Sequence, residues 1–262
     1  MKVRSADGTN IWCDEWGGGP PLILVHGTGD DAGVFDRVRD GLAEHFHLYV
    51  MHRRGRGKSG DHAAYEFARE VEDILAVIYG VGAPAGLFGH SYGGILSLDA
   101  ALETSNLAGM VIYEPPNIRV HDPRRTEIVE RLQVYMEKGE RDEVVRLFLH
   151  EFAGLPDEIV ARQRQKKEAW AQRVTEAHTI PRELVIVATY NLEVDRFGAI
   201  RTPARILVGG DTRSVMKETV EEVFQALANA DMRELAGNKH AAMTTAPDLF
   251  VDELCDFFRD HL

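Results

Sequence analysis

The stretch Ala85-Gly86-Leu87-Phe88-Gly89-His90-Ser91-Tyr92-Gly93-Gly94 decides the fold of this chain. It opens with a short apolar run and is followed by apolar residues at helical spacing, which predicts a strand, a sharp turn and a helix. A serine at such a turn is held in a strained backbone conformation, and its neighbours must be small because other backbone passes close by. The glycines that supply this space are Gly89, Gly93 and Gly94. The pattern predicts that Ser91 is an exposed nucleophile.

Short apolar runs alternate with stretches of helical period on both sides of this turn. Before and around it, strands are predicted over 10–15, 21–26, 47–51, 85–88 and 108–114, with helices over 34–44, 63–79 and 92–103. Near the C-terminus a strand over 204–208, a helix over 215–228, a strand over 232–235 and a helix over 247–262 continue the alternation. Such alternation is typical of an α/β fold with a mostly parallel sheet flanked by helices.

The segment 116–197 interrupts the alternation and is helical in pattern throughout. Helices are predicted there over 124–138, 140–152, 157–177 and 182–193. We therefore expect a discontinuous core over 1–115 and 198–262 with an inserted helical cap over 116–197. Its charged residues are interpreted as solvated helix faces, with a basic binding surface at 162–167 as the alternative. Tyr135 and Trp170 are candidate walls of a substrate pocket, although aromatic residues at helical spacing also pack a cap.

Composition limits the classes of partner. The 262 residues include 30 Lys plus Arg and 42 Asp plus Glu, a net charge of −12, which disfavours nucleic acid and anionic membrane as partners. No apolar run approaches the roughly 20 residues that cross a bilayer. The first seven residues have no apolar segment behind their basic residues, so we expect no secretory signal and a cytoplasmic location. Cys13 and Cys255, far apart in a large chain, are expected to be free thiols.

A serine hydroxyl needs a base to take its proton and an acid to orient that base. Asp211 follows the predicted strand 204–208 and the pair Gly209-Gly210, and His240 lies in a loop after the last predicted strand. The 29 residues between them (240 − 211) fit one helix and one strand. Both loops then reach the same carboxyl edge of a parallel sheet as Ser91, and the order Ser, Asp, His is that of one hydrolase fold.

The chain resembles the α/β-hydrolase superfamily, in the form that carries a helical cap. The motifs that carry the resemblance are His26-Gly27-Thr28-Gly29, Arg54-Gly55-Arg56-Gly57-Lys58-Ser59, the serine turn, Gly210-Asp211 and Gly237-Asn238-Lys239-His240. By this resemblance Ser91 is the nucleophile, His240 the general base and acid, and Asp211 the orienting carboxylate. The resemblance also implies that the backbone N–H groups of Thr28 and Tyr92 form the oxyanion hole. Some relatives carry the acid at the end of the strand before the insertion, which makes Glu114 the alternative to Asp211.

The resemblance implies acyl chemistry, because relatives that displace carbon use a carboxylate where this chain has Ser91. We expect a serine hydrolase, without cofactor or metal, that cleaves a small or medium carboxylic ester, lactone or thioester through an acyl-enzyme. One alternative is other chemistry at the same triad, by a lyase, a C–C bond hydrolase or an acyltransferase. A second is a catalytically silent ligand-binding module.

Two further motifs are interpreted as structural. Residues 56–59 suggest a phosphate-binding loop, but His52 stands where that loop needs a glycine, so we expect a turn with a solvated basic face. His90 is interpreted as a packed neighbour of the nucleophile, with a second base as the alternative.

Overall fold

The computed structural model describes residues 1–116, 123–189 and 193–262, and its contacts divide the chain into two compact units. The first unit is drawn from Met1–Gly27, Asp31–Asn117 and Glu193–Leu262, and the second from Thr28–Asp30 and Ile118–Leu192. The 3₁₀ helix Val194–Ala199, which the sequence placed mostly in the cap, belongs to the first unit. It packs on the helices α3 (Tyr92–Glu103) and α9 (Ser214–Ala226) of that unit. The cap itself stays a prediction.

An eight-stranded sheet organises the first unit. Its strand order is β1-β2-β4-β3-β5-β6-β7-β8, with β1 and β2 antiparallel to their neighbours and every other pair parallel. The strands are Lys2–Arg4, Asn10–Trp16, Pro21–Val25, His47–His52, Ala85–His90, Leu107–Tyr113, Ala204–Gly209 and Ala230–Leu235, from β1 to β8. All six residues of β5 are buried, as expected for a central parallel strand covered on both faces. The predicted α/β class is confirmed.

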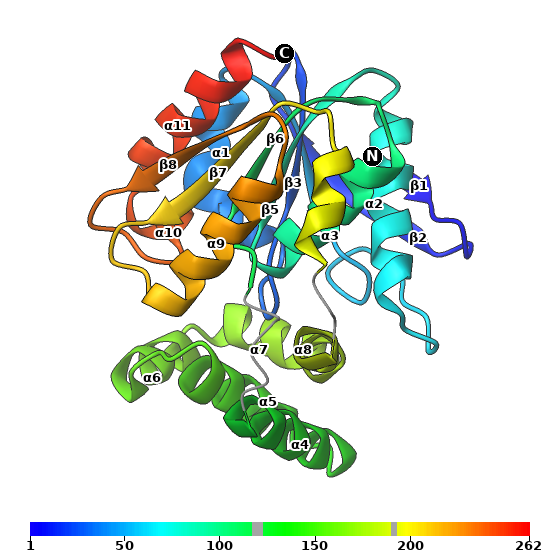
Figure 1. The fold of residues 1–262 in the computed structure, drawn as a ribbon. Coiled ribbons are helices and arrows are strands. Elements are labelled where there is room, and N and C mark those ends of the chain that lie inside the picture. Colours follow the sequence, from blue (N-terminus) through cyan, green and yellow to red (C-terminus); the bar gives the residue numbers. More distant parts are fainter. Residues whose placement is uncertain (117–122, 190–192) are drawn as a thin grey trace. The chain divides into compact units, whose positions relative to one another are not determined.

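Helices cover both faces of this sheet (Figure 1). On one face lie α1 (Asp36–Ala43) and α11 (Pro247–Arg259), and on the other α2 (Phe67–Val81), α3 (Tyr92–Glu103) and α9 (Ser214–Ala226). Phe88 of β5 packs edge-on against Phe250 of α11, with ring centroids 5.2 Å apart. These aromatic rings belong to the main apolar cluster between the sheet, α1 and α11.

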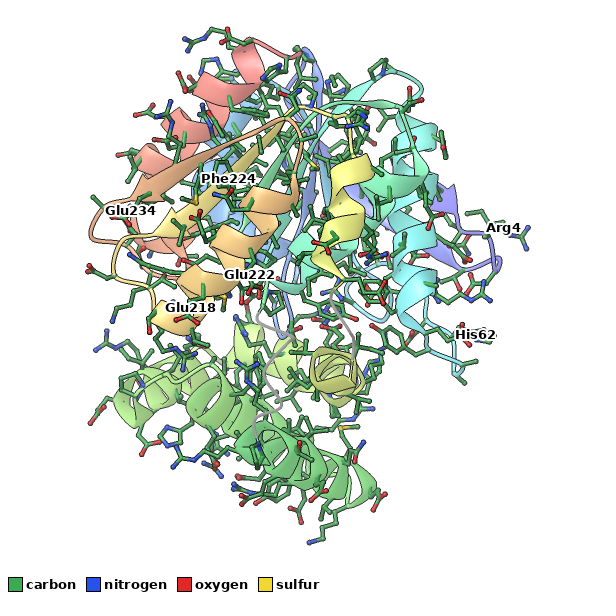
Figure 2. All side chains as sticks on the ribbon, viewed as in Figure 1. Arg4, His62, Glu218, Glu222, Phe224 and Glu234 are labelled. Carbon is green, nitrogen blue, oxygen red and sulfur yellow. The ribbon has the colours of Figure 1, made fainter. Side chains whose placement is uncertain are left out.

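The helix α9 illustrates why such segments are amphipathic. Val220 and Val223 are buried toward the unit's interior. Glu218 and Glu222 lie one turn apart along the same helix (Figure 2). Apolar residues at three-residue spacing thus identify the face that packs on the sheet, as the sequence predicted.

The second unit is helical. Its elements are α4 (Pro123–Glu137), α5 (Arg141–Leu147), the π-helical turn η2 (Phe148–Phe152), α6 (Asp157–Gln165), α7 (Lys167–Glu176) and α8 (Thr179–Thr189). The single helix predicted over 157–177 is wrong, because Lys166 adopts ψ 77° and separates α6 from α7. The end of the helix predicted over 182–193 lies partly outside the described residues.

Two short elements complete the described chain. A 3₁₀ turn (Ala32–Phe35) precedes α1, and α10 (Ala242–Thr245) precedes α11. Neither α10 nor β1 was predicted. Among the helices that the structure describes, none combines the length and the apolar character that a bilayer span requires.

Candidate active site

Ser91 lies at the turn between β5 and α3 with φ 54° and ψ −122°. A non-glycine residue in this region is strained, so the surroundings must hold it. The Ser91 N–H donates to the Tyr113 carbonyl at 2.9 Å, and the Ser91 carbonyl accepts from the Gly94 N–H at 2.8 Å. The backbone of the neighbouring strand β6 and the first turn of α3 therefore fix the strained turn from both sides.

Glycines make this arrangement sterically possible. A Cβ on Gly93 would lie 2.5 Å from the His26 carbonyl oxygen, and one on Gly89 would lie 2.5 Å from Ser97 Oγ. A Cβ on Gly27 would lie 3.0 Å from Ser91 Cβ. The loop after β3 thus passes directly beside the nucleophile turn, and the elbow geometry expected from the sequence is present.

His240 is paired with Glu114. The distance from His240 Nδ1 to Glu114 Oε2 is 2.6 Å, and the histidine side chain is 42 % exposed while Glu114 is fully buried. The other carboxylate oxygen, Oε1, accepts from the Gly209 N–H at 2.7 Å and from Thr212 Oγ1 at 2.6 Å. Burial alone would raise the pKa of Glu114, but the hydrogen bonds and the charge of His240 outweigh it and lower that pKa.

The expected pairing of His240 with Asp211 is not what the structure shows. Asp211 is exposed, and its backbone N–H donates to the Asn238 carbonyl at 2.9 Å. Spacing brought the 211 loop to the correct edge of the sheet, where Thr212 binds Glu114. The carboxylate that reaches His240 instead comes from the end of β6, where Glu114 has φ 45°. Glu114 was the alternative acid in the sequence analysis.

Hydrogen bonds from two aromatic side chains hold the loop that carries His240 in place. His90 Nε2 donates to the His240 carbonyl at 2.7 Å, and the two imidazole rings lie 4.6 Å apart. The Tyr113 hydroxyl donates to the Lys239 carbonyl, and the Ala242 N–H donates to the same hydroxyl at 3.3 Å. His90 thus has the packing role expected of it. The roles of Tyr113 and Thr212 were missed, since no motif in the sequence marks them.

Tyr92 follows the nucleophile and begins α3. Its ring is buried beside Phe67, with centroids 6.1 Å apart, and its hydroxyl lies 2.9 Å from the Tyr65 hydroxyl. Thr28, the other expected oxyanion donor, groups with the second unit. The oxyanion hole therefore stays a prediction.

The two candidate pocket residues lie in the second unit. Trp170 of α7 is 6 % exposed, and its Nε1 donates to Asp142 Oδ1 of α5 at 2.7 Å. Tyr135 of α4 is half-buried. Trp170 therefore joins two helices of its own unit, and a role for either residue as a pocket wall stays a prediction.

The arginines that follow β4 are buried. Arg53 and Arg54 are fully buried and Arg56 is 1 % exposed, so the solvated basic face expected there is wrong for Arg56. Acidic residues of α2 offset the burial of these charges: Glu70 pairs with Arg53 and Asp73 with Arg54. The charge of Arg56 also acts on Glu70 and helps to lower its pKa. Lys58 is the exposed base of this motif, with a side chain 55 % exposed.

Comparison with known proteins agrees with this geometry. The model of the Alpha/beta hydrolase family matches residues 22–253. A solved alpha/beta hydrolase from Sphaerobacter thermophilus DSM 20745 is 32 % identical, with a TM-score of 0.84 over 98 % of this chain and 100 % of that one.

Two curated relatives are less similar to this chain than the Sphaerobacter protein is. The uncharacterized hydrolase YraK of Bacillus subtilis (strain 168) is 26 % identical over 79 % of this chain and 76 % of its own. The pimeloyl-(acyl-carrier protein) methyl ester esterase of Aliivibrio fischeri (strain ATCC 700601 / ES114) is 21 % identical over 97 % and 99 %. Because the family model matches most of the length of this chain, the chain belongs to the alpha/beta hydrolase family.

Proposed function

We propose that this protein is a serine hydrolase that cleaves a small or medium carboxylic ester, lactone or thioester through an acyl-enzyme at Ser91. The observation that carries the proposal is the buried Glu114 carboxylate paired with His240 Nδ1 on the loop fastened to the Ser91 turn. A carboxylate, an imidazole and a strained serine on neighbouring loops are the groups that acyl transfer requires.

The protonation of His240 follows from its partner. An ionised carboxylate only accepts hydrogen bonds, and the lowered pKa of Glu114 keeps it ionised near neutral pH. The neutral imidazole must then carry its proton on Nδ1, which leaves the lone pair of Nε2 free to accept a proton. This is the tautomer that a general base for Ser91 needs.

The reaction follows in two halves. Ser91 Oγ attacks the substrate carbonyl carbon while His240 Nε2 takes its proton, and the imidazolium that forms is stabilised by Glu114. The same proton passes to the departing alcohol or thiol as the bond to it breaks. Water then gives a proton to His240 as it attacks the acyl-enzyme, and His240 returns that proton to Ser91 Oγ as the acid is released. The backbone N–H groups of Thr28 and Tyr92 are the proposed donors to the oxyanion of both tetrahedral intermediates.

The ester substrate class draws support from the relatives. The Aliivibrio fischeri relative is named a methyl ester esterase. The nucleophile here is a serine hydroxyl, which suits attack on an acyl carbon.

Replacement of the nucleophile tests the proposal. We expect Ser91→Ala to fold as the wild type does and to lose about 10⁵- to 10⁶-fold in kcat on p-nitrophenyl esters of short to long acyl chains. A fluorophosphonate should label the wild type at Ser91 by mass spectrometry and leave the variant unlabelled. Near-normal turnover by Ser91→Ala would disprove the assignment.

The same measurements separate the alternatives. Labelling at Ser91 without ester turnover would favour a lyase, a C–C bond hydrolase or an acyltransferase. An acyltransferase would be identified by transfer of the acyl group to an added alcohol. Absence of labelling in the folded wild type would favour a silent ligand-binding module.

A further inference from the structure

The carbonyl of Gly27 is held by two buried donors. Arg53 Nη1 donates to it at 3.1 Å, and His26 Nδ1 donates at 2.9 Å. Burial lowers the pKa of His26, so its ring is neutral, and Nδ1 must carry the proton because a carbonyl oxygen only accepts. Arg53 Nη1 also reaches the His26 carbonyl at 3.3 Å. One guanidinium thus contacts two successive peptide groups of the loop beside Ser91.

Arg53 is itself fixed by a two-bond ion pair. Its Nε and Nη2 donate to the two oxygens of Glu70 at 2.8 and 2.7 Å, and neither side chain has any exposed surface. Glu70 Oε1 also accepts from the Tyr65 hydroxyl at 2.7 Å. A guanidinium bound along two parallel bonds has a defined plane, which a single contact would not give it.

The same network extends to the residue after the nucleophile. The guanidinium carbon of Arg53 lies 4.9 Å from the centre of the Tyr92 ring, and the Tyr92 hydroxyl meets that of Tyr65 at 2.9 Å. Arg53 therefore contacts Gly27, the residue before one proposed oxyanion donor, and the side chain of Tyr92, the other proposed donor.

The contacts to the Gly27 carbonyl also determine the orientation of the Thr28 N–H. The carbonyl of Gly27 and the N–H of Thr28 belong to one planar trans peptide group, so they point in opposite directions. Holding the carbonyl fixes the direction of the N–H. We propose that Arg53 is a positioning residue that sets the Thr28 N–H as an oxyanion donor by binding the Gly27 carbonyl. This inference rests on the proposed function.

Two physical reasons make such a residue useful at this position. Gly27 has no Cβ, so its backbone rotates more freely than that of other residues, and a fixed partner is needed to keep the peptide in one orientation. A cation at the carbonyl also polarises the peptide and strengthens its N–H as a donor. Both effects act when negative charge develops on the substrate oxygen, so they change kcat more than KM.

The adjacent arginine provides a matched control. Arg54 is equally buried and donates from Nε and Nη2 to Asp73 at 2.7 Å each. Arg54 also donates to Asp7 Oδ2 and to the Arg69 carbonyl, which belong to other parts of the chain than the loop 26–28. Arg54→Lys therefore breaks a buried ion pair of the same kind without removing the contact to Gly27.

The experiment compares Arg53→Lys with Arg54→Lys on a p-nitrophenyl ester. Lysine keeps the charge but cannot reproduce the forked contacts. We expect Arg53→Lys to lower kcat about 10- to 100-fold with KM within about twofold of the wild type, because a displaced donor costs less than the 10²- to 10³-fold of a lost one. Affinity for a trifluoromethyl ketone, whose adduct with Ser91 carries an oxyanion, should fall in parallel. Arg54→Lys should keep kcat within about twofold.

Equal kcat for the two folded variants, or unchanged trifluoromethyl ketone affinity in Arg53→Lys, would overturn the inference. Ser91→Ala separates it from the proposed function: if that variant is inactive while Arg53→Lys matches Arg54→Lys, only the positioning role fails. If Arg53→Lys does not fold, Glu70→Gln removes the charge that fixes the guanidinium while keeping its shape. We expect at least a fivefold loss of kcat from it, and wild-type kcat would likewise overturn the role.

Discussion

Two acidic residues near His240 are expected to respond differently to neutralisation. In Glu114→Gln the amide can donate toward Nδ1, which forces the imidazole proton onto Nε2 and removes the base for Ser91. We expect kcat/KM to fall about 10³- to 10⁴-fold. Asp211 is exposed, and His240 Nδ1 is paired with Glu114 instead, so Asp211→Asn should stay within about twofold of the wild type.

Steady-state kinetics on one p-nitrophenyl ester, with circular dichroism to check folding, decides between them. A large loss in Asp211→Asn beside a small one in Glu114→Gln would restore the acid expected from spacing. Losses of equal size in both would mean that the 211 loop acts through Thr212, whose hydroxyl binds Glu114.

The sequence predicted Ser91 and His240 as site residues but placed the acid on Asp211. Spacing shows which loops reach the carboxyl edge of a parallel sheet, and it placed Asp211, His240 and Ser91 there. It does not show which side chain turns inward. That choice depends on the φ of 45° at Glu114 and on the donors from Gly209 and Thr212, which are features of tertiary packing.

At the scale of elements, the close contact between the nucleophile turn and β3 predicts a steric effect. A Cβ on Gly93 would lie 2.5 Å from the His26 oxygen and 2.6 Å from the Val25 oxygen, both backbone atoms that cannot move cheaply. We expect Gly93→Ala to lower the free energy of unfolding by about 1–3 kcal/mol or more, and to slow fluorophosphonate labelling of Ser91.

Gly18→Ala is the matched control, because a Cβ there meets nothing within 4 Å and its φ is not positive. Urea unfolding should place its midpoint beside that of the wild type. A Gly93→Ala protein as stable and as rapidly labelled as the wild type would show that the turn can adjust, contrary to the packing described.

The sequence pattern predicted some helices of the molecule well and missed the bounds of others. The helix over 92–103 coincides with α3, because glycines and a sharp turn mark its start and apolar spacing marks its length. The helix over 63–79 begins only at Phe67, since Glu66 is still extended. No glycine or proline marks the break at Lys166, so the sequence pattern did not predict it.

For the whole molecule, ionised carboxylates predict the response to acid. Burial would raise the pKa of Asp14, but hydrogen bonds from Lys58, His52 and Trp12 outweigh it and lower the pKa to about 2. The pKa values of Glu70 and Glu114 are lowered for similar reasons. Burial would raise both, but Arg53 outweighs it at Glu70 and His240 outweighs it at Glu114. Asp73 is an opposing case, since burial raises its pKa.

A carboxyl group whose pKa is lower in the folded than in the unfolded chain stabilises the fold above its unfolded pKa. That stabilisation is lost as the pH falls through the folded-state pKa. Unfolded carboxyl groups titrate near pH 4, and Asp14 titrates near pH 2 in the fold. We therefore expect the steepest fall of the urea midpoint between about pH 4.5 and pH 2. Buried His26 adds a loss that begins earlier, because its pKa is lowered in the fold while an unfolded histidine takes up a proton as the pH falls through about 6.5.

The variant Asp14→Asn tests how much of this acid response comes from one residue. The variant lacks the stabilisation from ionised Asp14, so its urea midpoint should lie below that of the wild type at pH 7, and the gap should close toward pH 2 as the wild type loses the same contribution. Asp40→Asn is the control: its side chain is 85 % exposed beside Arg39, and exposed pairs of this kind contribute little, so its midpoint should follow the wild type at every pH. A gap for Asp14→Asn that stays constant from pH 7 to pH 2 would show that the contacts to Lys58 and His52 do not depend on its charge. The acid response would then have to come from other groups, among them the buried carboxylates of Glu70 and Glu114.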